Sequence, residues 1–360
     1  MHIQSYNRSQ LLEFIHSDFY KNLEKIPISN HRALSHIHNP VCGDDDILLW
    51  VAYEENRMIG YIGALPDLCR INETPEKIYW LSCFWVDEAF RLKNTAASLF
   101  FLLMSRYKDR LFVSNIVPDL EKTYQSLRIF HPTVYKSGYR VYVRFCLKDL
   151  IGKHFPKTAI FSPVLKLFDA VGNVFLSGVT SFFKPPACDL SVMEDTCFDD
   201  RFQSFIEKHN QQECIKRDAG QFSWIISYPW VIQGIPDEES RKYYFSSKSL
   251  QFHYCSLKFY KEERLSGYCL LKIRDNAMWV SYVYADDNAM SDISSYLLNK
   301  ARTEKLNMIT VFDDNLKDSF VRHKKRYLFS KTIRRPYIIT KGMNTSDLYF
   351  QEGDGDAVFT

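Results

Sequence analysis

The sequence predicts an α/β fold made of two tandem units, each with a mixed, mostly antiparallel central sheet flanked by helices. The pattern Arg-x-x-Gly-Tyr occurs twice, at residues 57–61 and 264–268, and each copy lies between two strand-like runs. An aromatic-rich strand and then a segment of helical periodicity follow each copy. A chain of 360 residues is also long enough for two domains that each bury their own core.

The first unit is predicted over residues 1–150, with the element order β-α-β-β-β-α-β-α-β. Its first helix is expected to begin with Ser9 as the N-cap, because apolar residues follow at helical spacing. These residues are Leu11, Leu12, Ile15 and Phe19. The polar residues 54–57 predict a hairpin turn. We expect the strands at 1–6, 44–53, 58–65, 78–86, 111–116 and 139–147, and the other helices at 94–107 and 120–130.

The second unit, predicted over residues 191–345, repeats this order of elements. We expect its strands at 252–260, 268–273, 278–284, 308–312 and 337–340, and a helix at 290–303. Before them, Trp224, Tyr228 and Trp230 fit either a plain hydrophobic core or the wall of an acceptor cleft. Residues 346–360 are predicted to form an acidic tail, whose carboxylates are too short a series for a calcium loop.

Residues 151–190 break the pattern and are predicted to form an apolar, helical linker. Residues 155–183 are rich in Phe, Val and Leu, and residues 170–183 carry no charge. A membrane-spanning helix needs about 20 apolar residues, which this uncharged stretch does not reach. We expect amphipathic helices that dock on the two domains. The alternative is that 155–183 lies on a membrane or holds a partner protein.

Composition narrows the class of protein. A net charge of +3 gives no basis for nucleic-acid binding. The nine cysteines are an odd number without a CxxC pair, which is typical of reduced thiols in the cytoplasm and not of disulfides or a zinc site. We therefore expect no metal cofactor. Residues 1–5 lack the basic and apolar regions of a signal peptide, so the expected localisation is cytoplasmic.

Three places in the first unit resemble the GNAT (N-acetyltransferase) superfamily, in which an acyl-CoA thioester donates its acyl group to an amine. Residues 85–88, Trp-Val-Asp-Glu, resemble the end of that family's fourth strand. Residues 91–96, Arg-Leu-Lys-Asn-Thr-Ala, resemble its pyrophosphate loop, and residues 135–140 resemble its Tyr-x-x-x-Gly-Phe turn. The resemblance implies that acetyl-CoA or another acyl-CoA is bound by Val86, Arg91, Leu92, Lys93, Asn94, Thr95 and Ala96.

Each unit departs from the family pattern at the turn before its helix. Asn94 stands where the family prefers Gly, although Asn tolerates left-handed backbone geometry better than most residues. The corresponding turn of the second unit, residues 285–292, carries three carboxylates around a helix start, which would repel a pyrophosphate. The second unit is therefore predicted to be degenerate, and the first is the expected CoA site.

Acylation of an amine requires a base for the ammonium, whose pKa is about 10.4, and an acid for the leaving thiolate. Residues 78–86 hold no carboxylate or histidine, where many members of the superfamily carry the base. Glu76 and His131 are the nearest candidates for the base. Tyr135 matches the acid position and Tyr124 is the second choice, unless both only pack.

The function that the resemblance implies is acyl transfer from acyl-CoA to the amine of a small molecule or peptide, by direct attack in a ternary complex. The acyl group is expected to be acetyl, and the amine is unidentified. The alternative is a catalytically silent tandem protein that binds or scaffolds a partner.

Overall fold

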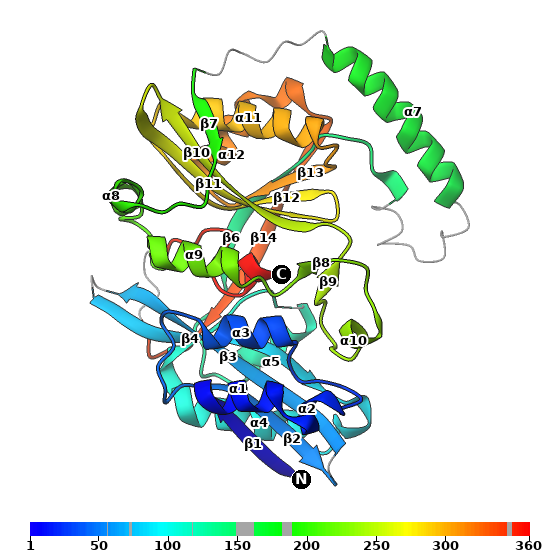
Figure 1. The fold of residues 1–360 in the computed structure, drawn as a ribbon, viewed down its shortest axis with the longest axis vertical. Helices are drawn as coiled ribbons and strands as arrows, with labels where there is room; N and C mark the ends of the chain where they lie inside the picture. Colours follow the sequence, from blue (N-terminus) through cyan, green and yellow to red (C-terminus); the bar gives the residue numbers. More distant parts are fainter. Residues whose placement is uncertain (56, 72–73, 117, 149–161, 182–188, 344–347) are drawn as a thin grey trace. The chain divides into compact units, whose positions relative to one another are not determined.

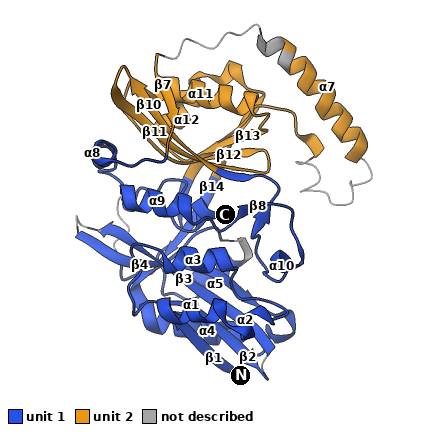
Figure 2. Ribbon diagram, in the orientation of Figure 1, with its two compact units in different colours: residues 1–136, 196–253, 334–360 blue, residues 137–195, 254–333 orange. Residues whose placement is uncertain are grey.

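The computed structural model describes residues 1–360 apart from 56, 72–73, 117, 149–161, 182–188 and 344–347. Figure 2 distinguishes two compact units. Unit 1 contains residues 1–136, 196–253 and 334–360, and unit 2 contains residues 137–195 and 254–333. Both units are thus discontinuous in sequence. The sequence predicts two domains as the continuous ranges 1–150 and 191–345. These domain boundaries stay a prediction, because the two units are defined by contacts between residues in space.

The sheet of unit 1 has the strand order β1-β2-β3-β4-β5-β14 (Figure 1). Its paired neighbours are antiparallel from β1 to β4, β4 and β5 are parallel, and β14 is antiparallel to β5. The strands are β1 His2–Asn7, β2 Ile47–Glu54, β3 Arg57–Ile71, β4 Thr74–Val86, β5 Leu111–Val113 and β14 Phe329–Ile339, of which residues 334–339 belong to unit 1.

Helices and short elements of unit 1 come from all three of its segments. From residues 1–136 they are α1 Arg8–His16, α2 Asp18–Lys21, α3 Asn30–Ile37, η1 Glu88–Phe90, α4 Thr95–Tyr107, η2 Lys108–Arg110 and α5 Pro118–Ser126. From the later segments they are α8 Asp200–His209, α9 Ala219–Ser227, β8 Ile232–Gln233, α10 Glu238–Arg241, β9 Lys248–Ser249 and η5 Ala357–Phe359.

The first helix begins two residues earlier than the sequence predicts. Asn7 is the N-cap in place of Ser9, because Asn7 Oδ1 accepts the Gln10 N–H at 3.0 Å and Gln10 Oε1 accepts the Asn7 N–H. The earlier start and an end at His16 change the apolar face. Leu11 and Ile15 are buried as predicted, Phe14 joins them, and Leu12 and Phe19 are exposed.

The sheet of unit 2 has the strand order β7-β10-β11-β12-β13-β6. Again one pair is parallel, β12 with β13, whereas β7–β10, β11–β12 and β13–β6 are antiparallel. The elements are β6 Val134–Tyr142, α7 Ser162–Ser181, β7 Ser191–Glu194, β10 Phe252–Lys261, β11 Arg264–Arg274, β12 Ala277–Ala285, α11 Met290–Thr303, β13 Met308–Val311, α12 Asp314–Arg322 and η4 Lys324–Arg326. The first residues of β6, 134–136, and of β10, 252–253, belong to unit 1.

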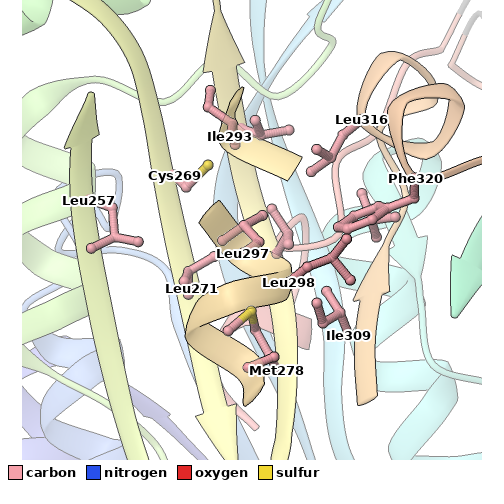
Figure 3. Packing of buried hydrophobic residues seen from close by; sticks show 14 of the residues in the cluster. Leu257, Cys269, Leu271, Met278, Ile293, Leu297, Leu298, Ile309, Leu316 and Phe320 are labelled. Atoms are coloured by element: carbon pink, nitrogen blue, oxygen red, sulfur yellow. The ribbon is translucent and has the colours of Figure 1, made fainter. Parts of the chain in front are cut away.

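The core of unit 2 forms between α11 and its sheet (Figure 3). Ile293, Leu297 and Leu298 of α11 are completely buried, and they lie at the helical spacing of one face. Strand residues such as Leu271 and Ile309 complete the cluster. Both units therefore have the mixed, mostly antiparallel sheet flanked by helices that the sequence predicts, which confirms the fold class.

Each sheet is completed by a strand from the other half of the chain. The strand predicted at 139–147 for the first unit is β6, and it pairs with β13 of unit 2. The strand predicted at 337–340 for the second unit lies in β14, and it pairs with β5 of unit 1. Both strands were therefore assigned to the wrong sheet. Alternation of apolar residues predicts a strand but does not identify its partner.

The repeated Arg-x-x-Gly-Tyr pattern makes the same ion pair in both units. Arg57 Nη2 lies 2.9 Å from Asp87 Oδ2, and Arg264 Nη2 lies 2.9 Å from Asp286 Oδ2. Burial opposes the charge of Asp87, but the Ala89 N–H and Arg57 hold the pKa of this carboxyl below its usual value. The motif thus ties the start of one strand to the end of the next.

The glycine of each copy lets the next long helix in the chain pack closely against the strand. A Cβ at Gly60 would lie 3.2 Å from Leu99 Cδ1 of α4, and a Cβ at Gly267 would lie 2.7 Å from Ile293 Cδ1 of α11. Only glycine lets strand and helix approach this closely. The motif therefore has a structural role in both units, and it positions the N-terminus of the helix.

A buried ion pair joins the segments of unit 1. Both terminal nitrogens of Arg217 donate to the Asp67 carboxylate of β3 at 2.8 Å, and Trp80 Nε1 donates to Asp67 Oδ2 at 3.0 Å. Asp354 Oδ1 lies 4.0 Å from Arg217 Nη2. The side chains of Arg217 and Asp67 are 2% and 4% exposed. The predicted acidic tail is therefore packed into unit 1, where Glu352 also pairs with Arg335 at 2.7 Å.

The predicted linker contains the helix α7, which begins at Ser162 and ends at Ser181. Linker residues 151–161 and 182–188 lie outside the described residues, as do 346–347 of the tail. No helix in the described ranges is both long and apolar enough to cross a membrane.

Asp67→Asn is expected to lower the free energy of unfolding by about 3–5 kcal/mol, because it removes the charge that compensates the buried Arg217 guanidinium. Lys21→Gln is the control, since Lys21 and Asp18 form an exposed pair at 3.3 Å whose loss costs at most about 1 kcal/mol. Urea unfolding followed by circular dichroism measures both variants. Equal losses would contradict the structural role of Asp67.

Candidate active site

Strands β4 and β5 pair only over a short distance and then separate. Their parallel pairing covers Tyr79 opposite Leu111 and Trp80 opposite Phe112. Beyond this point β4 continues to Val86, whereas β5 ends at Val113. Within the described residues, the edge of β4 over 81–86 that faces away from β3 therefore has no strand partner. Its backbone groups can pair with an extended ligand.

A bulge lies in this unpaired part of β4. The register with β3 shifts between Tyr61, opposite Trp85, and Gly63, opposite Ser82. Cys83 in the bulge has a φ of +43°, in the left-handed region that is unfavourable for a residue with a Cβ. Gly63 leaves room for it, because a Cβ there would lie 2.7 Å from Cys83 Sγ. The bulge changes the direction of the backbone N–H and C=O groups in the middle of β4.

The turn after β4 leads to a helix N-terminus without a side-chain cap. Asp87 accepts the Ala89 N–H at 3.1 Å and so caps η1. Asn94 then adopts the left-handed conformation with a φ of +59°, and no side chain caps α4. The first N–H groups of an α-helix have no partner within the helix, so this end of α4 suits a phosphate.

The residues predicted to bind the cofactor form one strand-turn-helix. Arg91 and Lys93 are exposed cations, Arg91 3.9 Å from Glu88 and Lys93 3.6 Å from Glu54. Leu92 is 97% exposed. Of the other predicted residues, Asn94 is exposed, Ala96 is half-buried, and Val86 and Thr95 are buried.

The corresponding turn of unit 2 is shorter and acidic. Asp286 is followed by α11 after only three residues, whereas seven separate Asp87 from α4. A cavity of about 700 Å³ in unit 2 is lined by Asp189, Asp286, Asp287 and Asp292, with Lys261 and Arg264 among the other residues. Burial, with the Asp189 charge next, raises the pKa of Asp292. Such a turn disfavours a pyrophosphate.

The predicted catalytic residues lie on separate elements and stay predictions. Glu76 is exposed on β4, ten residues and about 30 Å of strand before Val86. A ring nitrogen of His131 hydrogen-bonds to the Met343 carbonyl at 2.8 Å, and the His131 N–H donates to the Ile339 carbonyl. Tyr135 is half exposed on β6.

The two tyrosines differ in their surroundings. The Tyr135 hydroxyl donates to Glu121, and this hydrogen bond raises the pKa of Tyr135. Tyr124 lies on α5 and packs against Phe100 and Phe130, with ring centroids 5.9 and 5.7 Å away. Burial raises the pKa of Tyr124, so its hydroxyl keeps its proton at neutral pH.

A carboxylate that sequence reasoning missed lies at the end of β5. Asp356 Oδ1 accepts from Ser114 Oγ at 2.9 Å and from Asn115 Nδ2 at 3.0 Å, directly after the strand. Gly355 before it has a φ of +81°, and a Cβ there would lie 2.9 Å from Ser114 Oγ and 3.1 Å from the Trp80 ring. Asp356 is half-buried, so a solute can still reach it.

A buried arginine lies beside the bulge. Arg32 of α3 donates to Tyr243 Oη at 2.9 Å and to Ser82 Oγ, and its guanidinium lies 3.8 Å from the Trp230 ring centroid. Burial alone would lower the pKa of Arg32, but Tyr243, Cys83 and Asp356 hold it above its ordinary value.

Cys83 is not an activated nucleophile. The side chain is buried, and burial raises the pKa of this thiol, so the reactive thiolate is disfavoured. A buried thiol of this kind packs as a small apolar side chain.

Neither a protein-family model nor a curated protein matches this sequence. Among solved structures, the chain is similar to a conserved protein of unknown function from Enterococcus faecalis V583, described as a probable N-acyltransferase. The TM-score is 0.54 at 7% identity, over 94% of this chain and 73% of the other. This chain has the GNAT fold.

Two further solved structures are similar at TM-scores below 0.5. The Saccharomyces cerevisiae N-myristoyltransferase with bound myristoyl-CoA has a TM-score of 0.49 at 10% identity, over 94% of this chain and 82% of that one. A GCN5-related N-acetyltransferase from Anabaena variabilis has a TM-score of 0.48 at 9% identity, over 93% and 72%.

Gly355→Ala is expected to destabilise the packed tail by about 1–3 kcal/mol, because the added Cβ meets Ser114 and Trp80 and the positive φ is unfavourable. Gly178→Ala in α7 is the control, since a Cβ there meets nothing within 4 Å. Thermal unfolding and protection of residues 348–360 from hydrogen exchange report the effect. Unchanged exchange in Gly355→Ala would contradict this packing.

Proposed function

We propose that unit 1 is an acyl-CoA-dependent N-acyltransferase, which transfers an acetyl or other acyl group to an amine by direct attack in a ternary complex. The observation that carries the proposal is the free edge of β4 leading into the uncapped N-terminus of α4. The GNAT fold supports it, although fold alone does not determine function.

The CoA pyrophosphate would bind at the start of α4. Thr95 is completely buried, so the N–H group of the half-buried Ala96 is the one that the positive end of the helix offers, and the Arg91 and Lys93 side chains add positive charge nearby. Asn94 in its left-handed conformation lets the backbone turn toward the ligand. The pantetheine arm would then run back from Val86 along the free edge of β4, as an added strand does.

The thioester would lie at the bulge around Cys83. Backbone N–H groups there would stabilise the negative charge that develops on the thioester oxygen. The buried Arg32 would fix the bulge through Ser82, since it bonds the hydroxyl next to Cys83 in sequence. In this assignment Arg32 is a positioning residue and the backbone acts on the substrate.

Asp356 is the base that we assign to the reaction. Its carboxylate has two neutral hydrogen-bond donors, lies at the end of β5 and is half-buried. It would accept the proton of the ammonium, directly or through water, so that the free amine attacks the thioester carbon. The new C–N bond replaces the C–S bond, and the CoA thiolate leaves and is protonated. Tyr135, or Tyr124 as the second choice, stays the predicted acid.

The proposed acceptor is an amine-bearing small molecule or peptide. Unit 2 would not bind CoA, because its cavity is lined by four aspartates. Glu76 and His131 have no step in this scheme. A cytoplasmic location stays an expectation from the sequence.

Acetyl-CoA is expected to bind the wild-type protein, and Arg91→Glu is expected to weaken binding at least tenfold, because a carboxylate replaces a cation beside the pyrophosphate. Arg322→Glu, an equal charge change on the exposed face of α12, should bind like the wild type. Isothermal titration calorimetry measures all three. Absence of binding by the wild type would remove the enzyme proposal and leave the binding or scaffold alternative.

Asp356→Asn is expected to lower the transfer rate by about 10²- to 10⁴-fold with unchanged affinity for acetyl-CoA. The amide keeps an acceptor oxygen for Ser114 and Asn115 and loses only the charge. Release of free CoA thiol, measured against a panel of small amines and peptides as a function of pH, reports the rate. A variant with wild-type turnover and an unchanged pH profile would show that another group is the base.

A further inference from the structure

Unit 1 contains a cavity of about 100 Å³ that is lined in part by β3 and β4. Met58 and Tyr61 of β3 and Trp85 of β4 contribute to it, and Tyr61 is the register partner of Trp85. The other lining residues come from the loop between α2 and α3 and from residues 241–244, at the end of α10 and after it. All of them belong to unit 1. This cavity, the Trp85 cavity, therefore adjoins the strand on which the thioester is proposed to lie.

The Trp85 cavity and Cys83 lie on the same face of the sheet. Met58, Tyr61 and Cys83 belong to one buried cluster with residues of α1 and α3. Trp85 packs against this cluster, whereas Val86 belongs to a different cluster with residues of α4. Trp85 and Cys83 are two residues apart, which is about 7 Å of strand. A ligand anchored in the cavity can therefore present a second group to the bulge.

The charged residues that line the Trp85 cavity are cations. Lys25, Arg241 and Lys242 line it, and none of its described lining residues carries a carboxylate. Asp87 lies 3.7 Å from Lys25 Nζ and Glu239 lies 3.0 Å from Lys242 Nζ, so two of the three charges are compensated. Arg241 is exposed and makes no ion pair with another residue that the structure describes. One uncompensated cation therefore favours an anionic group on the ligand.

The rest of the lining is apolar or aromatic. Ile26 and Met58 are buried, and the ring centroids of Tyr61 and Tyr244 lie 5.4 and 5.9 Å from that of Trp85. A cavity of about 150 Å³ is large enough to take up benzene. The smaller volume of about 100 Å³ therefore suits a short alkyl group. The lining as a whole fits a carboxylate next to a short, branched alkyl chain.

The proposed base lies at the other end of this ligand. Burial raises the pKa of the Cys83 thiol, the Arg32 charge lowers it, and the Asp356 charge raises it again. The Asp356 carboxylate thus acts at the bulge, where one ammonium group can give up a proton. A second cationic group on the same ligand would be repelled by Arg32 or by Arg241. A polyamine is therefore a poor acceptor, and an amine that also carries a carboxylate suits both ends.

We propose that the Trp85 cavity binds the carboxylate and alkyl group of a short aliphatic amino acid, whose amine is the acceptor of the acyl group. The carboxylate would pair with Arg241, the alkyl group would contact Ile26 and Met58, and the amine would face the bulge. The products are the N-acyl amino acid and CoA. Of the two protons that the ammonium loses, one protonates the CoA thiolate and one passes through Asp356 to solvent. The role as acceptor rests on the proposed acyl transfer, whereas binding in the cavity does not.

Saturation-transfer NMR on the full chain, with and without CoA, tests binding separately from transfer. The probes are L-leucine and isopentylamine, because isopentylamine is L-leucine without its carboxylate. The wild type is expected to bind L-leucine about tenfold more tightly than isopentylamine. Arg241→Glu should lose this preference, and Arg241→Lys should keep it. The matched control is Arg322→Glu, an equal charge change on the exposed face of α12, which should bind like the wild type.

Release of CoA thiol from acetyl-CoA with the same two amines tests the role as acceptor. Arg241→Glu should lower kcat/KM for L-leucine about tenfold, mainly through KM, and should not lower it for isopentylamine. The inference is overturned if the wild type binds the two probes equally, or if Arg241→Glu binds L-leucine as the wild type does. Acetyl-CoA binding without L-leucine binding would also overturn it and leave the proposed function. L-leucine binding without acetyl-CoA binding would support the amino-acid site and remove the proposed function.

Discussion

The candidate active site depends on the buried ion pair of Asp67 and Arg217. The pair joins β3 to the segment 196–253, and Asp354 in the tail lies beside the same guanidinium. Because both charges are buried, loss of either leaves the other uncompensated in a medium of low dielectric. The tail held in this way carries Asp356 to the end of β5. The base that we propose is thus a residue remote in sequence from the strand that would bind the thioester.

The two units share a framework and differ at the turns that lead into α4 and α11. The Arg-x-x-Gly-Tyr pattern makes equivalent ion pairs and equivalent helix-strand contacts in both units. The turns that lead into α4 and α11 have diverged. Unit 1 has a long turn with two exposed cations, and unit 2 has a short turn beside a cavity lined by aspartates. The fold is therefore common to both units, whereas the proposed pyrophosphate site is assigned to unit 1 alone.

Local patterns predicted the elements well, because helical and strand periodicity depend on near neighbours. Strands β2 to β4, helix α4 and the left-handed tolerance of Asn94 are examples. The exchange of β6 and β14 could not be predicted, since alternation does not identify a partner strand. Asp356 and Arg32 were missed because their partners, such as Ser114 and Tyr243, are more than 200 residues away. The helix start at Asn7 was missed because two nearby polar residues could each cap it.

The central claim is that one unit alone receives CoA, at the turn between β4 and α4. Hydrogen exchange of the full chain with and without acetyl-CoA tests it most directly, since bound phosphate and a paired β4 edge would both slow exchange. The account predicts protection at residues 82–97 and no change at residues 286–293. Protection at 286–293, or saturation with acetyl-CoA without protection at 82–97, would contradict it.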